Sequence, residues 1–222
     1  MLKKYVCFLA TFSLFLLSCG GGESDETEES NETAAYDRAE MLKYWADKII
    51  IPSYNSFSSS LSALDSKTKT FVETPNQANL SDLRTAWLNS YKAWQHVEMF
   101  DIGKAEEIFY KSKMNIYPVD QSWLENSVST ESFDLDNANS YSSQGLPALD
   151  YLLNGVAASD NDIITKYTAN NKYKNYLSAV VAKMISNTKL VVDDWSTYKA
   201  CFVSSTANTS TSSAHKLLND CG

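Results

Sequence analysis

The sequence is short of the residues that most hydrolytic and nucleotide-binding sites require. It contains two histidines, His96 and His215, and they form no H-E-x-x-H or H-x-x-E-H arrangement. A zinc peptidase usually takes two nitrogen ligands from a helix face together with a carboxylate, so the usual helical pair is missing. The chain also lacks a G-x-S-x-G elbow, a P-loop and a G-x-G-x-x-G loop. Acyl-enzyme and nucleotide chemistry therefore have no support.

Glycine and proline are scarce as well, with 7 and 4 residues in a chain of 222. No segment of useful length alternates apolar and polar residues as a half-buried strand does. Apolar residues instead recur every three or four positions over long stretches. The sequence therefore predicts an all-α fold, an antiparallel helical bundle with irregular connections.

Three segments carry the clearest helical spacing. The first runs from Tyr36 to about Phe71 and should bend or break at residues 48–52, because Pro52 removes a backbone donor. The second runs from about Leu80 to Phe100 with a mainly aromatic stripe, and the third covers Lys172–Trp195.

The remaining stretches give weaker signals. A short helix is expected over Gly145–Gly155, with Pro147 tolerated in its first turn. Residues 103–143 should be mainly irregular, with a short helix near 119–127. Residues 204–213 should form a loop, and a further helix is expected to begin at Ala214.

No apolar run is long enough to span a membrane, because Tyr5–Leu17 falls short of about 20 residues. Two lysines precede this run and Ser18-Cys19 follows it, which is typical of a lipoprotein signal. We expect residues 1–18 to be cleaved and Cys19 to be lipidated, so that the chain is anchored to the outer membrane, facing the periplasm or the cell surface. An ordinary cleaved signal is the alternative. Residues 19–35 then form a disordered acidic tether, and residues 36–222 form the helical domain.

Basic residues are outnumbered, 19 against 27 acidic ones, which gives a formal net charge of −8. Such a surface should repel nucleic acid and can attract cations, so no nucleic-acid partner is expected. After the signal and the lipidated residue are set aside, two cysteines remain, Cys201 and Cys221. A disulfide between them and two unpaired thiols are both open.

Carboxylates beside aromatic residues are the remaining candidates for chemistry. Glu98 and Asp101 are three residues apart, so they are expected to share a helix face. Their oxygens could bind iron or another divalent or trivalent metal. The alternative is that these acids lie on a solvated edge of the helix or cap its end. The candidate metal or ligand residues are Trp87, Trp94, His96, Glu98, Asp101, Glu106 and Asp150.

Four ordered segments of the sequence resemble the imelysin family. They are the W-x3-Y-x2-W-Q-x-x-E run over 87–106, the M-N-x-Y-P-x-D run over 114–120, the G-L-P-A-L-D-Y-L-L run over 145–153, and an early segment over 47–54. The resemblance implies two related helical bundles, of which this chain holds the N-terminal half and is truncated at its C-terminal end. It also implies a secreted or lipid-anchored protein linked to iron or haem acquisition.

The family is grouped with the M75 metallopeptidases because of a G-x-H-x-x-E motif, and this chain departs from it. Gly145 is kept, but Pro147 stands in place of the histidine and Asp150 in place of the glutamate. We therefore assign no catalytic residues. The resemblance implies a lipoprotein that binds a metal, a haem-related ligand or an iron-uptake partner protein. A metal-dependent endopeptidase and a truncated partner-binding remnant are the alternatives.

Overall fold

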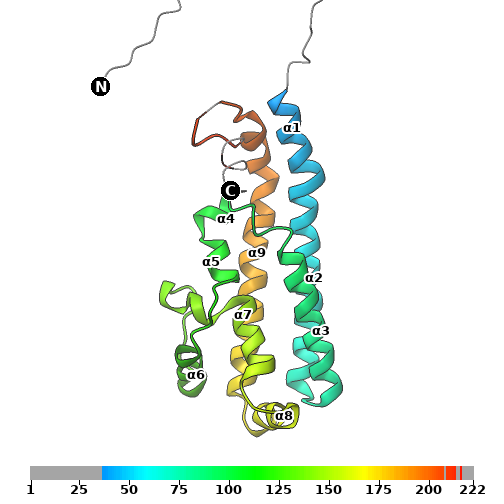
Figure 1. Cartoon of the computed structure of the whole chain (residues 1–222), viewed down its shortest axis with the longest axis vertical. Helices are drawn as coiled ribbons and strands as arrows, with labels where there is room; N and C mark the ends of the chain where they lie inside the picture. Colours follow the sequence, from blue (N-terminus) through cyan, green and yellow to red (C-terminus); the bar gives the residue numbers. More distant parts are fainter. Residues whose placement is uncertain (1–36, 208, 214–215, 217–222) are drawn as a thin grey trace, which may run out of the picture. The chain divides into compact units, whose positions relative to one another are not determined.

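Three long helices form the framework of the bundle. In the computed structural model, which describes residues 37–207, 209–213 and 216, these helices are α2 (Ile51–Glu73), α3 (Gln77–Trp94) and α9 (Lys172–Ser204). They lie side by side in Figure 1, and α2 packs against both α3 and α9. Every regular element in the described part of the chain is helical. The predicted all-α bundle is confirmed.

Shorter helical elements connect the long ones. They are α1 (Arg38–Trp45), α4 (Lys104–Glu107), α5 (Tyr110–Met114), α6 (Gln121–Thr130), α7 (Gly145–Asp150), α8 (Asp160–Ala169), the 3-10 turn η2 (Ala138–Ser143) and the π-helical segments η1 (Ala46–Ile50) and η3 (Tyr151–Gly155). Residues 103–143 are therefore more helical than the sequence predicted. The short helix expected over Gly145–Gly155 is present as α7 followed by η3.

The first helix does not break at Pro52. It continues through α1, η1 and α2, and the Ile51 N–H donates to the Ala46 carbonyl five residues back. In an ordinary α-helix the proline ring clashes with the carbonyl group four residues earlier. The wider π-helical turn just before Pro52 makes room for this ring. The bend predicted at residues 48–52 is therefore a π-helical turn in a continuous helix.

The core follows the helical stripes. On α2 the side chains of Tyr54, Phe57, Leu61 and Leu64 are all buried, at spacings of three and four residues. Each fully buried side chain of this size contributes roughly 1.5–3 kcal/mol relative to an exposed one. The stripe predicted on α9 is likewise buried, and that helix runs beyond its expected end to Ser204.

Helix α3 ends at Trp94, short of the predicted end at Phe100. Beyond it the backbone turns tightly, with the His96 N–H donating to Ala93 O at 3.2 Å and the Val97 N–H to Trp94 O at 2.9 Å. Glu98 and Asp101 therefore lie past the helix end. The prediction that these two acids share a helix face is wrong, because the helix on which the spacing depends has already stopped.

Several predictions lie outside the described residues. They concern the signal over 1–18, the lipidated Cys19, the tether over 19–35, Cys221, and most of the helix expected from Ala214. Cys201 is exposed and forms no disulfide within the described part of the chain, so its pairing with Cys221 stays a prediction. Among the helices of that part, none is long and apolar enough to cross a bilayer.

Gly145 gives the first testable prediction, because its backbone has φ +76° and a Cβ built there would lie 2.3 Å from Met114 O. Gly145→Ala should lower the free energy of unfolding by about 2 kcal/mol or more, measured by urea unfolding. Gly155→Ala is the comparison variant: Gly155 does not have positive φ, and its added Cβ meets the Tyr151 side chain at 2.7 Å and no backbone atom, so its loss of stability should be smaller. Equal stability of Gly145→Ala and wild type would contradict the prediction.

Candidate functional site

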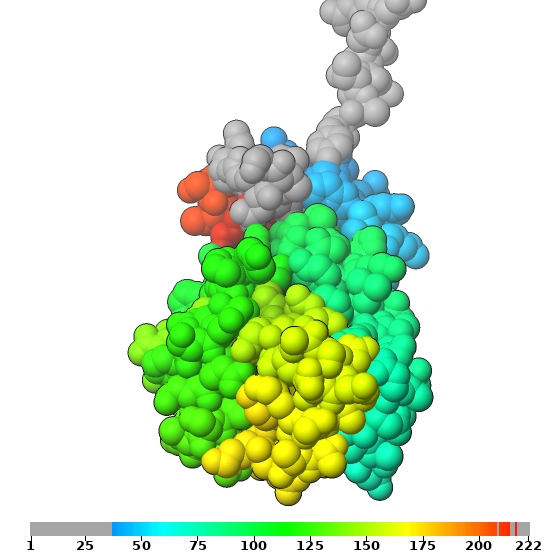
Figure 2. Space-filling view, turned by 60° about the horizontal axis from the view of Figure 1, so that its bottom comes forward, coloured from blue at the N-terminus to red at the C-terminus, as the bar shows by residue number. Residues whose placement is uncertain are grey.

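A pocket of about 470 Å³ lies where segments distant in the sequence meet. Its walls come from α3, from residues 115–121, from α7 and from η3. In Figure 2 these regions adjoin, with teal α3 and the green segment flanking the yellow one. We name it the motif pocket, and its lining residues are Trp87, Tyr91, Asn115, Tyr117, Val119, Gln121, Leu146, Pro147, Asp150, Tyr151, Asn154 and Gly155.

The α3 wall is aromatic. Trp87 and Tyr91 lie one helical turn apart, so their side chains share a face. Their rings stack with centroids 5.9 Å apart and planes at 5°. The Trp87 indole N–H donates to the Leu146 carbonyl at 3.0 Å, which ties α3 to the first turn of α7.

The second wall depends on a close backbone approach. Gly145 lets the start of α7 pass against the carbonyl of Met114, and this contact sets residues 115–121 beside α7. The Asp120 N–H donates to Ser142 O at 2.8 Å. The Asp120 carboxylate accepts the Trp123 N–H at 2.9 Å, which caps α6 and fixes where the segment turns.

The π-helical wall is anchored through its carbonyl groups. Arg84 of α3 donates to Leu153 O at 2.8 Å and forms an ion pair with Asp160 at 2.7 Å. The Tyr167 hydroxyl of α8 donates to Leu152 O at 3.1 Å. Side chains thus satisfy carbonyls near the end of η3, where intrahelical partners run out.

Tyr151 is held by an acid behind the pocket. Its hydroxyl donates to one Glu125 carboxylate oxygen at 2.8 Å, and the Tyr173 hydroxyl donates to the other at 2.6 Å. Burial, followed by the Glu125 carboxylate, raises the pKa of Tyr151 to about 12. The phenol therefore stays neutral at physiological pH and keeps its hydrogen bond to Glu125.

Asp150 supplies the only carboxylate of the lining. It is exposed at the last position of α7, and its Oδ1 accepts the side-chain N–H of Asn154 at 2.8 Å. The amide therefore turns its nitrogen, not its oxygen, toward the acid. Lysine, arginine, histidine and cysteine are absent from the lining.

The structure brings together only part of the predicted site. Trp87, Pro147 and Asp150 line the motif pocket, with Gly145 at the adjoining contact. Trp94 is fully buried in the core, with its ring 5.5 Å from Phe57. It therefore cannot bind a ligand beside Trp87 and the acids as predicted.

The other predicted site residues lie outside the motif pocket. Glu106 pairs with Lys216, His96 is exposed, and Asp101 is half-buried, where its charge adds to burial in raising the pKa of Tyr54. Neither these three nor Glu98 belong to the lining. Over 37–207, 209–213 and 216, no three His, Cys, Asp or Glu side chains are grouped to hold a metal ion. The expectation that these acids and aromatic residues form one ligand site is therefore corrected.

Sequence reasoning also missed residues of the pocket. Asn115 and Tyr117 lie in a segment that carried the family resemblance, but they were not expected to bind a ligand. Gln121, Tyr151 and Asn154 carried no separate signal. Their positions depend on how α7 meets residues 115–121, which sequence spacing does not give.

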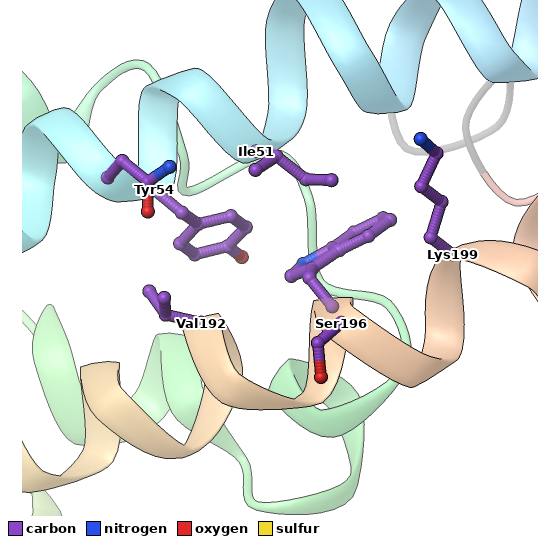
Figure 3. Close-up of a pocket in the computed structure, with 7 residues that line it drawn as sticks. Ile51, Tyr54, Val192, Ser196 and Lys199 are labelled. Atoms are coloured by element: carbon purple, nitrogen blue, oxygen red, sulfur yellow. The ribbon is translucent and has the colours of Figure 1, made fainter.

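A second hollow, of about 260 Å³, lies between α2 and α9 (Figure 3). Three of its polar side chains already have partners within the chain. Lys199 pairs with Asp47, the Tyr54 hydroxyl donates to Phe100 O at 2.9 Å, and the Ser196 hydroxyl donates to Asp193 O at 2.7 Å. We therefore regard it as a packing groove and the motif pocket as the candidate site.

Comparison with known proteins gives matches in sequence and in fold. The peptidase M75 family model, described as Imelysin, matches residues 50–221. Iron-regulated protein A of Synechococcus elongatus is 27% identical over 93 residues, which cover 42% of this chain and 26% of the relative. The chain thus matches about a quarter of that relative's length.

Two solved structures are similar in fold. An iron-regulated protein A precursor from Parabacteroides distasonis aligns with a TM-score of 0.66 at 16% identity, over 83% of this chain and 54% of the other. An imelysin-like protein from Psychrobacter arcticum aligns with a TM-score of 0.64 at 18% identity, over 83% and 58%. The chain therefore spans little more than half the length of either.

The raised pKa of Tyr151 predicts a loss of stability at alkaline pH. An unfolded tyrosine releases its proton near pH 10, whereas folded Tyr151 keeps its proton to about 12. In that window the folded state binds more protons than the unfolded state, so the free energy of unfolding falls as pH rises.

Tyr151→Phe should therefore show a shallower fall than wild type in urea unfolding between about pH 10 and about pH 12. Tyr44→Phe is the control, because its ring is 60% exposed, and it should keep the wild-type slope. A Tyr151→Phe slope equal to that of wild type would count against the prediction.

Proposed function

The chain belongs to the imelysin family, and from this premise we propose that it is a non-hydrolytic member that binds a small ligand in the motif pocket. One observation carries the proposal. Three segments that resemble the family, around Trp87, Tyr117 and Pro147, converge on one pocket. Pockets with mainly apolar walls and a few polar groups are the usual form of ligand sites.

The lining does not suit hydrolysis. The family's G-x-H-x-x-E motif implies a metal, but Pro147 has no side-chain donor and Asp150 is a single carboxylate. One oxygen of that carboxylate already accepts the Asn154 amide. A catalytic zinc usually takes three protein ligands. The residues of the pocket therefore do not fit the metal, and no hydrolytic step is derived from it.

An iron-linked role is supported by the relatives' names, since two of them are called iron-regulated protein A. We propose that this chain acts outside the cytoplasm in iron acquisition, held at the outer membrane through Cys19. Its ligand there is a metal complex, a haem-related molecule or another small molecule of that system, and a protein partner in iron uptake would receive it.

The first test concerns binding. A metabolite library, with haemin and ferric citrate added, is screened by thermal shift. Hits should quench tryptophan fluorescence in wild type and in Trp123→Phe, whose side chain is not in the lining. The quenching should be lost or strongly reduced in Trp87→Phe. Failure of every compound to bind, or quenching that is unchanged in Trp87→Phe, would remove the motif pocket as the ligand site.

The second test concerns hydrolysis. Wild type should not cleave fluorescein-labelled unfolded casein in the presence of Zn²⁺ or Mn²⁺, and Zn²⁺ titration should give no calorimetric heat from the pocket. The double variant Pro147→His, Asp150→Glu rebuilds the helical donor pair and should gain Zn²⁺ binding. Metal-dependent cleavage by wild type, abolished by Asp150→Asn, would overturn the non-hydrolytic assignment.

A further inference from the structure

The charge of the motif pocket limits what it can hold. Four aromatic rings line it, those of Trp87, Tyr91, Tyr117 and Tyr151, together with the Asp150 carboxylate. No lining residue carries a positive charge. A ligand entering the pocket therefore meets ring systems and one negative group.

Two cationic side chains on the neighbouring elements, those of Arg84 and Lys166, are engaged away from the pocket. Arg84, one turn before Trp87, binds Asp160 and the Leu153 carbonyl. Lys166 donates to the Tyr173 hydroxyl at 3.2 Å. A second acid, Glu125, lies directly behind Tyr151 through their 2.8 Å hydrogen bond. Of these groups, the Glu125 carboxylate adds to the negative charge of Asp150.

Three ligand classes can be compared on this basis. An anion has no counter-charge in the lining and is repelled by Asp150. A bare hard cation such as Ca²⁺ takes six to eight oxygen ligands, and the pocket offers a single carboxylate. An organic cation such as a quaternary ammonium or a guanidinium is weakly hydrated and is attracted both by aromatic rings and by a carboxylate, which this pocket provides together.

We propose that the motif pocket selects a small organic cation, carrying an ammonium or guanidinium group, over neutral molecules, anions and bare metal ions. This inference rests on the proposed function and names the ligand class of the same site. Among the ligands proposed there, it selects the other small molecule over an anionic metal complex or haem. The cationic group lies among the aromatic rings, and Asp150 at the exposed end of α7 supplies the counter-charge.

The test uses three molecules of nearly the same shape and different charge. Choline is the cation, 3,3-dimethylbutan-1-ol its neutral isostere, and 3,3-dimethylbutanoate the matching anion. Each is titrated by calorimetry into the purified full chain. Choline should bind about three- to thirtyfold more tightly than the alcohol, the range expected for a cation against aromatic rings. The anion should not bind.

Variants assign the effect to the pocket. Asp150→Asn keeps the shape of the side chain and removes its charge, and Tyr117→Ala removes a ring that is 86% exposed, so neither should unfold the protein. Both should weaken choline binding. Asp193→Asn, an exposed position on α9, makes the same change in net charge outside the lining and should leave the affinity unchanged.

The outcomes separate the two levels of the proposal. If the alcohol or the anion binds as tightly as choline, and binding still depends on Tyr117, the organic-cation inference is wrong while the pocket remains a ligand site. If choline binds equally well to wild type, Asp150→Asn and Tyr117→Ala, the inference is wrong because the site lies elsewhere. If none of the three molecules binds, the inference fails, and the library screen on Trp87 decides the proposed function separately.

Discussion

The motif pocket depends on one close backbone contact, the passage of Gly145 against the carbonyl of Met114. A Cβ at that position would lie 2.3 Å from the carbonyl oxygen, so only glycine fits without a shift of the chain. The contact brings residues 115–121 beside α7, and the Trp87 indole then fastens α3 to the same turn through Leu146 O. Once these two links are made, aromatic and amide groups separated by about sixty residues of sequence face a common space. The pocket is thus a consequence of how α7 starts, and not of any single binding motif.

Most of the fold could be predicted from apolar spacing, because the long helices bury one stripe each. Leu61 and Leu64 on α2 and Val180 and Met184 on α9 are examples, and all are buried. Two of the features that were not predicted have different causes. Helix α3 stops at Trp94 through tight backbone turns that no glycine or proline marks, and α8 was missed because its apolar stripe is short. The signal for α8 was present in Ser159, whose hydroxyl accepts the Asp162 N–H and caps the helix.

The candidate site could be predicted only where residues lie within segments of family resemblance. Trp87, Pro147 and Asp150 were expected and line the pocket, but the grouping of Glu98 and Asp101 with them assumed a helix that has already ended. Spacing along a sequence gives a shared face only while the helix continues. The role of Glu125, which holds Tyr151 from behind, depends on a tertiary contact across 26 residues and has no local signature. The departure of Pro147 from the family motif was visible in the sequence. The lining contains no histidine or cysteine that could replace the missing histidine as a metal ligand.

A pocket with aromatic walls, one carboxylate and no cationic side chain suits recognition better than bond cleavage, and it makes charge the main criterion of selection. The most direct measurement is the change in the indole and side-chain amide signals of the ¹⁵N-labelled chain as choline is added. The indole signal of Trp87 and the amide signals of Asn115 and Asn154 should move together and saturate, while those of Trp94 and Trp195, outside the lining, stay in place. Shifts confined to Trp195, beside the groove between α2 and α9, or no saturable shift at Trp87, would contradict the assignment of the motif pocket as the site that binds an organic cation.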